Sequence, residues 1–192
     1  MPPVNGAQAG LDGQQWTSVP FAPACLAFLQ AEWDKIPAAA ATNRSLIDHP
    51  DLNSGVQNQH RLELLRTRRQ PLLEQIPTNT SWFEVRYLTA EHVHQLLVIG
   101  RCGWDSPSDS NELARVAQRC SKLLATDPSK WAHPLLWGHS REGPFTILEG
   151  NNRLVALAGT VPRLDFTLPV YVGLSTMPCL WHLPDPFPVA GA

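Results

Sequence analysis

The residues best suited to chemistry lie in one short stretch, residues 143–159, which reads GPFTILEGNNRLVALAG. The residues at its start alternate between apolar and polar side chains as in a strand, and those at its end repeat at helical spacing. The sequence therefore predicts a strand-to-helix joint, with an acid, a glycine, two amides and an arginine at the joint itself. These are Glu149, Gly150, Asn151, Asn152 and Arg153.

This combination of side chains suits a phosphate-bearing ligand. The start of a helix attracts anions, because its backbone N–H groups lack partners and carry the positive end of the helix dipole. Gly150 would let a phosphate approach the backbone, Asn151 and Asn152 add amide groups, and Arg153 offers a planar fork of donors. Glu149 would hold a divalent metal that bridges phosphates, or take a proton from an attacking hydroxyl. We therefore predict phosphate binding at residues 150–153, with Glu149 as the catalytic and metal-binding residue.

A purely structural reading explains the same residues. Asparagine is a common helix N-cap and glycine is common where a strand ends. Arg153 could simply form an ion pair with Glu149 or Glu142. The residues alone leave a phosphate site and a structural joint both open.

The flanking sequence predicts a hairpin that positions the joint. PLLWGHS (residues 134–140) and PFTIL (144–148) read as two strands around the turn REG. Trp137 and His139 fall on the strand that pairs with the motif strand, so we expect them to line the same pocket and contact a base. A position in the hydrophobic core is the usual alternative for a tryptophan.

Further strands and helices complete a mixed pattern that predicts an α+β fold. WFEVRYL (82–88) alternates like a strand with one solvent-exposed face, and LPVYVGLS is expected to form another strand. Four segments read as helices: 23–37, 58–77 with a break at Pro71, 90–100 after a Thr89 cap, and 109–124. The arginines of 58–77 are expected on a solvated face.

The order helix, strand, turn, strand, Glu-Gly-Asn-Asn-Arg-Leu, short helix resembles the ParB/sulfiredoxin family over roughly residues 81–174. Members of that family carry Gly-x-x-Arg at this joint. The resemblance implies a small mixed sheet with flanking helices and an N-terminal helical extension. The expected divisions are a flexible tail (1–20), the helical extension (21–80), the ParB/sulfiredoxin-like domain (81–175) and a proline-rich tail (176–192).

The resemblance also implies a ligand and a reaction. It implies that the residues from Gly150 to Arg153 cradle the phosphates of ATP or CTP, with Mg²⁺ bridging them. Asn151 stands where sulfiredoxins place their reactive cysteine, so sulfinic acid reduction is not expected. Glu149 matches an acid of the free serine kinases of this fold, which implies phosphoryl transfer to a small hydroxyl-bearing acceptor or nucleotide hydrolysis. Asp105 and Glu84 are the candidates for a second acid.

The alternative function is a non-catalytic module that binds a nucleotide or phosphorylated ligand and recruits a protein or DNA partner. The formal net charge of −2 over 192 residues gives no general case for binding nucleic acid or a membrane surface. With no signal peptide pattern or apolar span, we expect a cytoplasmic protein. Its four cysteines form no CxxC pair and are expected to be reduced, and neither His92/His94 nor Cys179/His182 reads as a metal site.

Overall fold

A computed structural model of the protein describes residues 14–36, 43–88, 97–98, 118, 122, 125, 131–143, 145–150, 153–154 and 168–177. These residues include a mixed sheet in the order β1-β2-β6-β4-β5-β3. The strands are β1 (Trp16–Val19), β2 (Ser81–Leu88), β3 (Leu97–Val98), β4 (Leu135–Gly138), β5 (Phe145–Glu149) and β6 (Leu168–Leu174).

The sheet contains both parallel and antiparallel pairs. Strand β6 pairs antiparallel with β2 and parallel with β4, and β5 pairs antiparallel with β4 and parallel with β3. The predicted hairpin is therefore confirmed as β4 and β5. Gly143 takes a φ of +80° in its turn, a conformation that glycine adopts without strain. Helices together with this mixed sheet confirm the α+β class.

The helices whose bounds the structure gives precede β2. They are α1 (Phe21–Glu32), extended by the 3₁₀ turn η1 (Trp33–Lys35), α2 (Ser45–Asp48) and α3 (Gly55–Gln75). Helix α3 is kinked at Arg69, whose φ of −127° and ψ of 23° are not helical. This confirms the predicted break, because Pro71 removes an amide donor and crowds the preceding turn. Within the described ranges, no helix combines the length and apolar character needed to cross a membrane.

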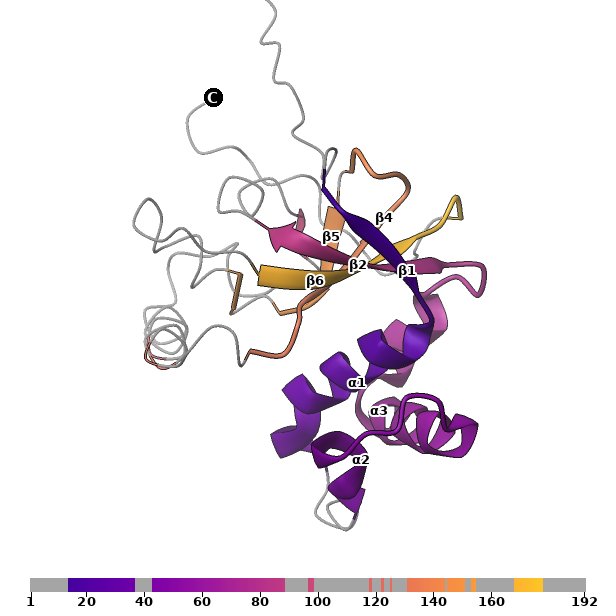
Figure 1. The fold of residues 1–192 in the computed structure, drawn as a ribbon, viewed down its shortest axis with the longest axis vertical. Coiled ribbons are helices and arrows are strands. Elements are labelled where there is room, and N and C mark those ends of the chain that lie inside the picture. Colours follow the sequence, from indigo (N-terminus) through magenta and orange to yellow (C-terminus); the bar gives the residue numbers. More distant parts are fainter. Residues whose placement is uncertain are drawn as a thin grey trace, which may run out of the picture.

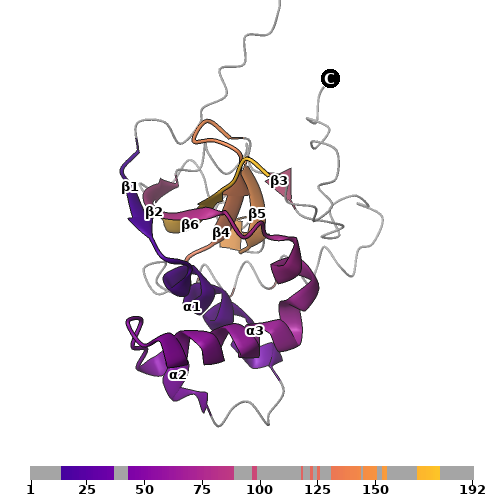
Figure 2. The same cartoon turned by 90° about the vertical axis from the view of Figure 1, so that its right-hand side faces the viewer.

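The helices gather on one side of the sheet, with α1 lying next to it (Figures 1 and 2). Phe28 and Leu29 of α1 pack in the same buried cluster as Leu65 of α3 and as Trp82 and Trp137 of the sheet. The predicted division between residues 21–80 and 81–175 therefore does not coincide with a break in the core. The helices and the sheet bury their apolar faces against each other.

Two predictions near the first strands need correction. Residues 16–19 do not belong to a flexible tail, since they form β1 and pair with residues 82–85 of β2. Strand β2 has only part of the solvent-exposed face expected, since Arg86 is exposed and Glu84 half-buried but Trp82 on the same side is buried. Helix α1 covers that side, and the alternation within one strand carries no information about such a covering layer.

Two predicted helices fall largely outside the described residues. In the segment 90–100, Leu97 and Val98 form β3 beside β5, so the helix expected there is wrong at these two positions. An apolar run of this length does not distinguish a helix from a buried strand. In the segment 109–124, Gln118 and Lys122 are helical and the other positions lie outside the described residues.

The arginines of α3 do not all lie on a solvated face. Arg61 is fully buried and donates hydrogen bonds to the carbonyl oxygens of Leu46 (3.1 Å) and Asp51 (2.8 Å). Its guanidinium also donates to the side chains of Gln57 and Asn58. Arg61 lies one turn before buried Leu65, so its position on the apolar stripe of the helix was a signal for burial.

Candidate functional site

The joint after β5 has the predicted strand-to-helix geometry. Strand β5 ends at Glu149, and Arg153 and Leu154 are helical. The Leu154 N–H donates to the Gly150 carbonyl oxygen at 2.9 Å, which is a helical bond between residues four apart. Asn151 and Asn152 lie outside the described residues, so their predicted ligand contacts stay predictions.

Gly150 is needed for both its conformation and its contact with Pro134. Its φ of +105° is one that side-chain-bearing residues rarely adopt, and a Cβ added there would lie 2.8 Å from the Pro134 Cβ. The glycine therefore lets the chain turn sharply while packing directly on the residue before β4.

A buried ion pair closes the joint. The Arg153 Nη2 donates to the Glu149 Oε2, and its Nη1 donates to the Ala132 carbonyl oxygen. The two side chains are only 8% and 12% exposed, which strengthens their attraction. Burial lowers the pKa of Arg153 to about 10, while the negative charge of Glu32 opposes this shift, so the guanidinium stays protonated at neutral pH. The structural pairing of Arg153 with Glu149, left open by the sequence, is present.

Trp137 and His139 do not lie at the joint. Glu149 is paired with Leu135 at the start of β4, whereas Trp137 is paired with Thr146 and His139 follows the other end of β4. His139 is thus four residues from Leu135, about 13 Å along a strand. Trp137 belongs to the hydrophobic core, and the exposed His139 bonds through Nδ1 to the Ser175 carbonyl oxygen at 3.0 Å. The expectation that both line the pocket at the joint is not met.

The segment before β4 takes the place expected of Trp137 and His139. Ala132 accepts the Arg153 hydrogen bond and Pro134 contacts Gly150, so Trp131 and His133 flank the residues that touch the joint. The sequence repeats Trp-x-His at 131–133 and 137–139. In an antiparallel hairpin the end of the second strand meets the start of the first. This rule favours Trp131 and His133, rather than Trp137 and His139, as the pair that lies near the joint.

A pocket of about 330 Å³ opens beside this segment, between it and α1. It is lined by Pro23, Leu26, Ala27 and Gln30 from α1, by Trp131, Ala132 and His133, and by Tyr171 from β6. Ala132 thus belongs to both the pocket wall and the Arg153 contact. A ligand in this pocket would lie next to the ion pair.

The polar groups of this pocket influence one another. The rings of His133 and Tyr171 lie 5.3 Å apart between centroids. Burial lowers the pKa of His133, with Glu84 opposing and Arg153 reinforcing that shift, so its imidazole is neutral at pH 7. Burial raises the pKa of Tyr171, and Glu84, its partner across β2 and β6, raises it further. Glu84, one of the two candidates for a second acid, therefore lies beside the pocket.

The remaining sequence candidates give no second site within the described ranges. Asp105, the histidines at 92 and 94, and the pair Cys179 and His182 lie outside them. Across the described residues, no three His, Cys, Asp or Glu side chains group closely enough to hold a metal ion. Cys25 is a free thiol, as predicted, and burial raises its pKa to about 12, which makes it a poor nucleophile.

Comparison with known proteins does not assign this site. No protein-family model matches the chain, and no curated protein and no solved structure matches it.

Proposed function

We propose that the protein is a nucleotide-binding enzyme of the ParB/sulfiredoxin-like fold, which uses ATP or CTP for phosphoryl transfer to a small hydroxyl-bearing acceptor or for nucleotide hydrolysis. The proposal places the phosphates at the turn from Gly150 to Arg153, with Asn151 and Asn152 as further contacts. The observation that carries it is the buried Glu149 and Arg153 pair, which closes a glycine turn beside a pocket.

The ion pair supports anion binding because a side-chain carboxylate, which a phosphate can replace, holds the guanidinium. Among the described residues, Arg153 donates to one charged group, Glu149, and to one backbone carbonyl, that of Ala132. A phosphate can replace a carboxylate on a guanidinium, since both accept two parallel hydrogen bonds. In the proposal the phosphate displaces Glu149, and the carboxylate turns toward the reacting groups.

The pocket beside the joint suits the rest of the nucleotide. Its volume of about 330 Å³ falls at the lower end of typical small-molecule sites. Trp131 and Tyr171 offer aromatic surface for a base, and Gln30 and neutral His133 offer hydrogen bonds. We assign the base to this pocket in place of the Trp137 and His139 expected from the sequence.

The chemistry proposed for Glu149 is that of a general base. Once released from Arg153, the carboxylate takes the proton of the acceptor hydroxyl. The hydroxyl oxygen attacks the terminal phosphorus of the nucleotide, and the nucleoside diphosphate leaves. Arg153 then neutralises charge on the transferred group. In this proposal Mg²⁺ comes with the phosphates of the nucleotide, where it needs only one or two protein carboxylates, and Glu149 stays the candidate for that contact.

The alternative, a non-catalytic nucleotide- or phospho-ligand-binding module, also has an observation in its favour. Glu149 is already paired with Arg153, so its presence at the joint is explained without a catalytic role. Such a joint can bind a ligand without turnover.

A binding experiment tests the phosphate site. We expect calorimetric titration with Mg-ATP and Mg-CTP to give saturable binding of at least one nucleotide. Arg153→Ala should weaken it at least tenfold, because a charge-assisted contact worth ~1.5–3 kcal/mol is lost. Arg44→Ala removes the same charge from an exposed pair with Asp48 and is the matched control. Equal affinity of wild type and Arg153→Ala would show that Arg153 is structural.

A turnover experiment separates the enzyme from the binding module. Glu149→Gln keeps an oxygen that accepts from Arg153 but removes the base. Nucleotide consumption with a panel of hydroxyl acceptors should fall by about 10²-fold, while nucleotide affinity is largely kept. Wild-type protein that binds nucleotide without consuming it, alone or with any acceptor, would support the binding module instead.

A further inference from the structure

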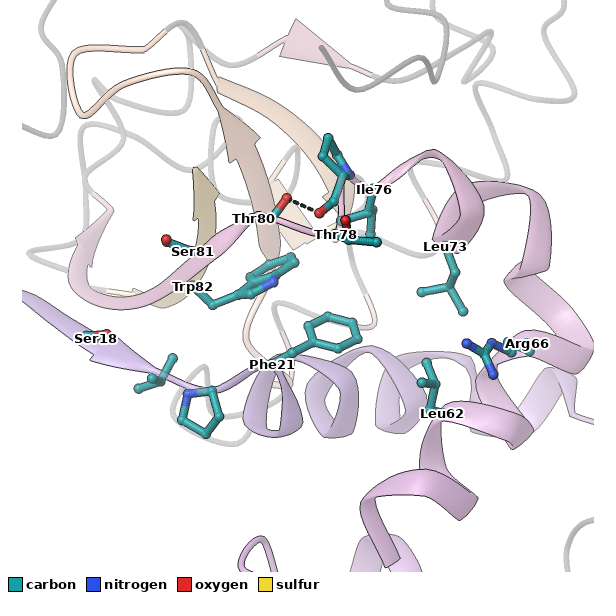
Figure 3. Close-up of a pocket in the computed structure, with 13 residues that line it drawn as sticks. Ser18, Phe21, Leu62, Arg66, Leu73, Ile76, Thr78, Thr80, Ser81 and Trp82 are labelled. Atoms are coloured by element: carbon teal, nitrogen blue, oxygen red, sulfur yellow. Dashed lines mark hydrogen bonds between the residues drawn. The ribbon is translucent and has the colours of Figure 1, made fainter. Parts of the chain in front are cut away.

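A second, larger pocket lies where the helices join the sheet. It has a volume of about 460 Å³ and shares no lining residue with the pocket beside Arg153. Its walls come from the end of β1 and the start of α1, from α3, and from the turn that leads into β2 (Figure 3). The lining residues are Ser18, Val19, Pro20, Phe21, Leu62, Arg66, Leu73, Ile76, Pro77, Thr78, Thr80, Ser81 and Trp82.

The inner wall of this pocket is apolar and held in place. Figure 3 shows Phe21, Leu62 and Leu73 pointing toward the same space. The Phe21 and Trp82 rings lie 4.9 Å apart between centroids. Trp82 also packs over Gly173, where an added Cβ would lie only 3.1 Å from the indole. A wall fixed from two sides lowers the ordering cost of binding an apolar group.

The turn at the mouth of the pocket is also fixed. The Thr80 hydroxyl and backbone N–H both donate to the Pro77 carbonyl oxygen, at 2.6 and 3.0 Å. Thr78 and Ser81 of the same segment are exposed. Their hydroxyl groups give the mouth hydrogen-bonding capacity that the inner wall lacks.

The charge of the pocket lining indicates which kind of ligand the pocket would bind. Arg66 is the single charged residue of the lining, and its exposed guanidinium makes no hydrogen bond or ion pair to another described residue. A cation at the rim of an apolar pocket favours a ligand with one negative group and an apolar body. The polyphosphate of a nucleotide carries several charges and would find a single partner here.

We propose that this pocket is a binding site for a small monocarboxylate with a ring-sized apolar body, whose carboxylate pairs with Arg66 while its ring packs against Phe21 and Trp82. The site is independent of the nucleotide function proposed above. Because the pocket is lined by α1, α3 and β2, its ligand joins the helical layer to the sheet and stabilises their contact.

Calorimetry with two matched probes tests the site. Indole-3-acetate carries the ring and the carboxylate, and indole-3-ethanol carries the ring with a neutral hydroxyl. Wild-type protein should bind the acid saturably and the alcohol about threefold to tenfold more weakly, the range for one exposed charge-assisted contact. Arg66→Ala should reduce the affinity for the acid to that for the alcohol and leave the alcohol unaffected.

Two further variants locate the binding. Arg44→Ala removes an exposed arginine elsewhere and should change neither affinity. Thr78→Trp places a bulky ring at an exposed lining position and should weaken both probes, with folding checked by circular dichroism. The proposal is overturned if wild type binds neither probe, if it binds acid and alcohol equally, or if Arg66→Ala binds the acid as tightly as wild type.

Discussion

Two buried arginines hold two different regions of this molecule. Arg61 holds the segment from α2 to the start of α3, and its hydrogen-bond acceptors there are all uncharged groups. Arg153 holds the joint after β5 through one carboxylate and one carbonyl. Both are buried, at 0% and 7% exposure, so burial alone does not distinguish Arg61 from the arginine that we propose binds phosphate.

The difference lies in what a ligand would have to displace. Freeing Arg61 means breaking bonds to two backbone carbonyls, and therefore opening the loop itself. Freeing Arg153 from its charged partner requires only that the Glu149 side chain rotate. A pocket adjoins Arg153 through Ala132. We infer that the number and kind of acceptors, rather than burial, indicate which buried charge a ligand can reach.

The largest expected effect is on stability, from Arg61→Leu. The change leaves buried carbonyls without donors, so the free energy of unfolding should fall by about 3–4 kcal/mol, while nucleotide affinity stays within about twofold. Urea denaturation measures the first and calorimetry the second. Arg44→Leu, on the exposed surface, should cost less than ~0.5 kcal/mol. If Arg61→Leu lost as little stability as Arg44→Leu, Arg61 would not have the structural role that distinguishes it from Arg153.

The next largest effect is expected at the glycine of the joint. Gly150→Ala adds a Cβ that meets Pro134 and forces a side chain into a positive φ, which should cost about 2–3 kcal/mol of unfolding free energy. Gly143→Ala in the hairpin turn also has a positive φ, but its Cβ would lie 3.2 Å from the Phe145 ring rather than 2.8 Å from Pro134, so it should cost about 1 kcal/mol. Equal losses in parallel urea unfolding curves would mean that the contact with Pro134 is not what requires a glycine at the joint.

A smaller effect is expected from Arg153→Lys. Lysine keeps the charge but has no planar fork, so nucleotide affinity should weaken about threefold to tenfold and the free energy of unfolding should fall by about 1 kcal/mol. Calorimetry and urea denaturation on the same preparation test both values. If Arg153→Lys lost as much stability as Arg61→Leu and kept full affinity, Arg153 would have the same structural role as Arg61.

The smallest effect concerns pH and His133. Burial lowers the pKa of this imidazole in the folded state below its ordinary value of 6.5, although Glu84 opposes the shift. The unfolded chain therefore binds the proton more readily, and stability is lost as the pH falls below about 6.5. His133→Gln should reduce the loss of unfolding free energy between about pH 7.5 and about pH 5.5. If the unfolding free energy depends on pH in the same way in wild type and His133→Gln, His133 does not cause the loss of stability at low pH.

The sequence predicted the local elements well where pattern and stop signals agreed. The hairpin, the kink before Pro71 and the joint after Glu149 follow from alternation, proline chemistry and a glycine at a strand end. The partial burial of Glu84 and the burial of Trp82 depend on which layer packs on which face of the sheet, and that information is not in a single segment.

The pocket residues show the same limit more sharply. The hairpin was predicted correctly, yet Trp137 and His139 were placed at the wrong end of it. Pairing direction alone brings the residues before β4, among them Trp131 and His133, to the end of β5. The α1 side of that pocket comes from residues 23–30, more than a hundred positions away, and sequence spacing cannot reveal such a contact.

One NMR titration tests within a single molecule whether phosphate binds Arg153 and leaves Arg61 in place. The Nε–H signals of Arg61 and Arg153, assigned from Arg61→Leu and Arg153→Lys spectra, are followed while Mg-ATP or Mg-CTP is added. We expect the Arg153 signal to shift saturably with at least one nucleotide, as phosphate replaces Glu149, while the Arg61 signal stays in place. An Arg153 signal that does not move with either nucleotide, or one that moves only as Arg61 does, would contradict this expectation.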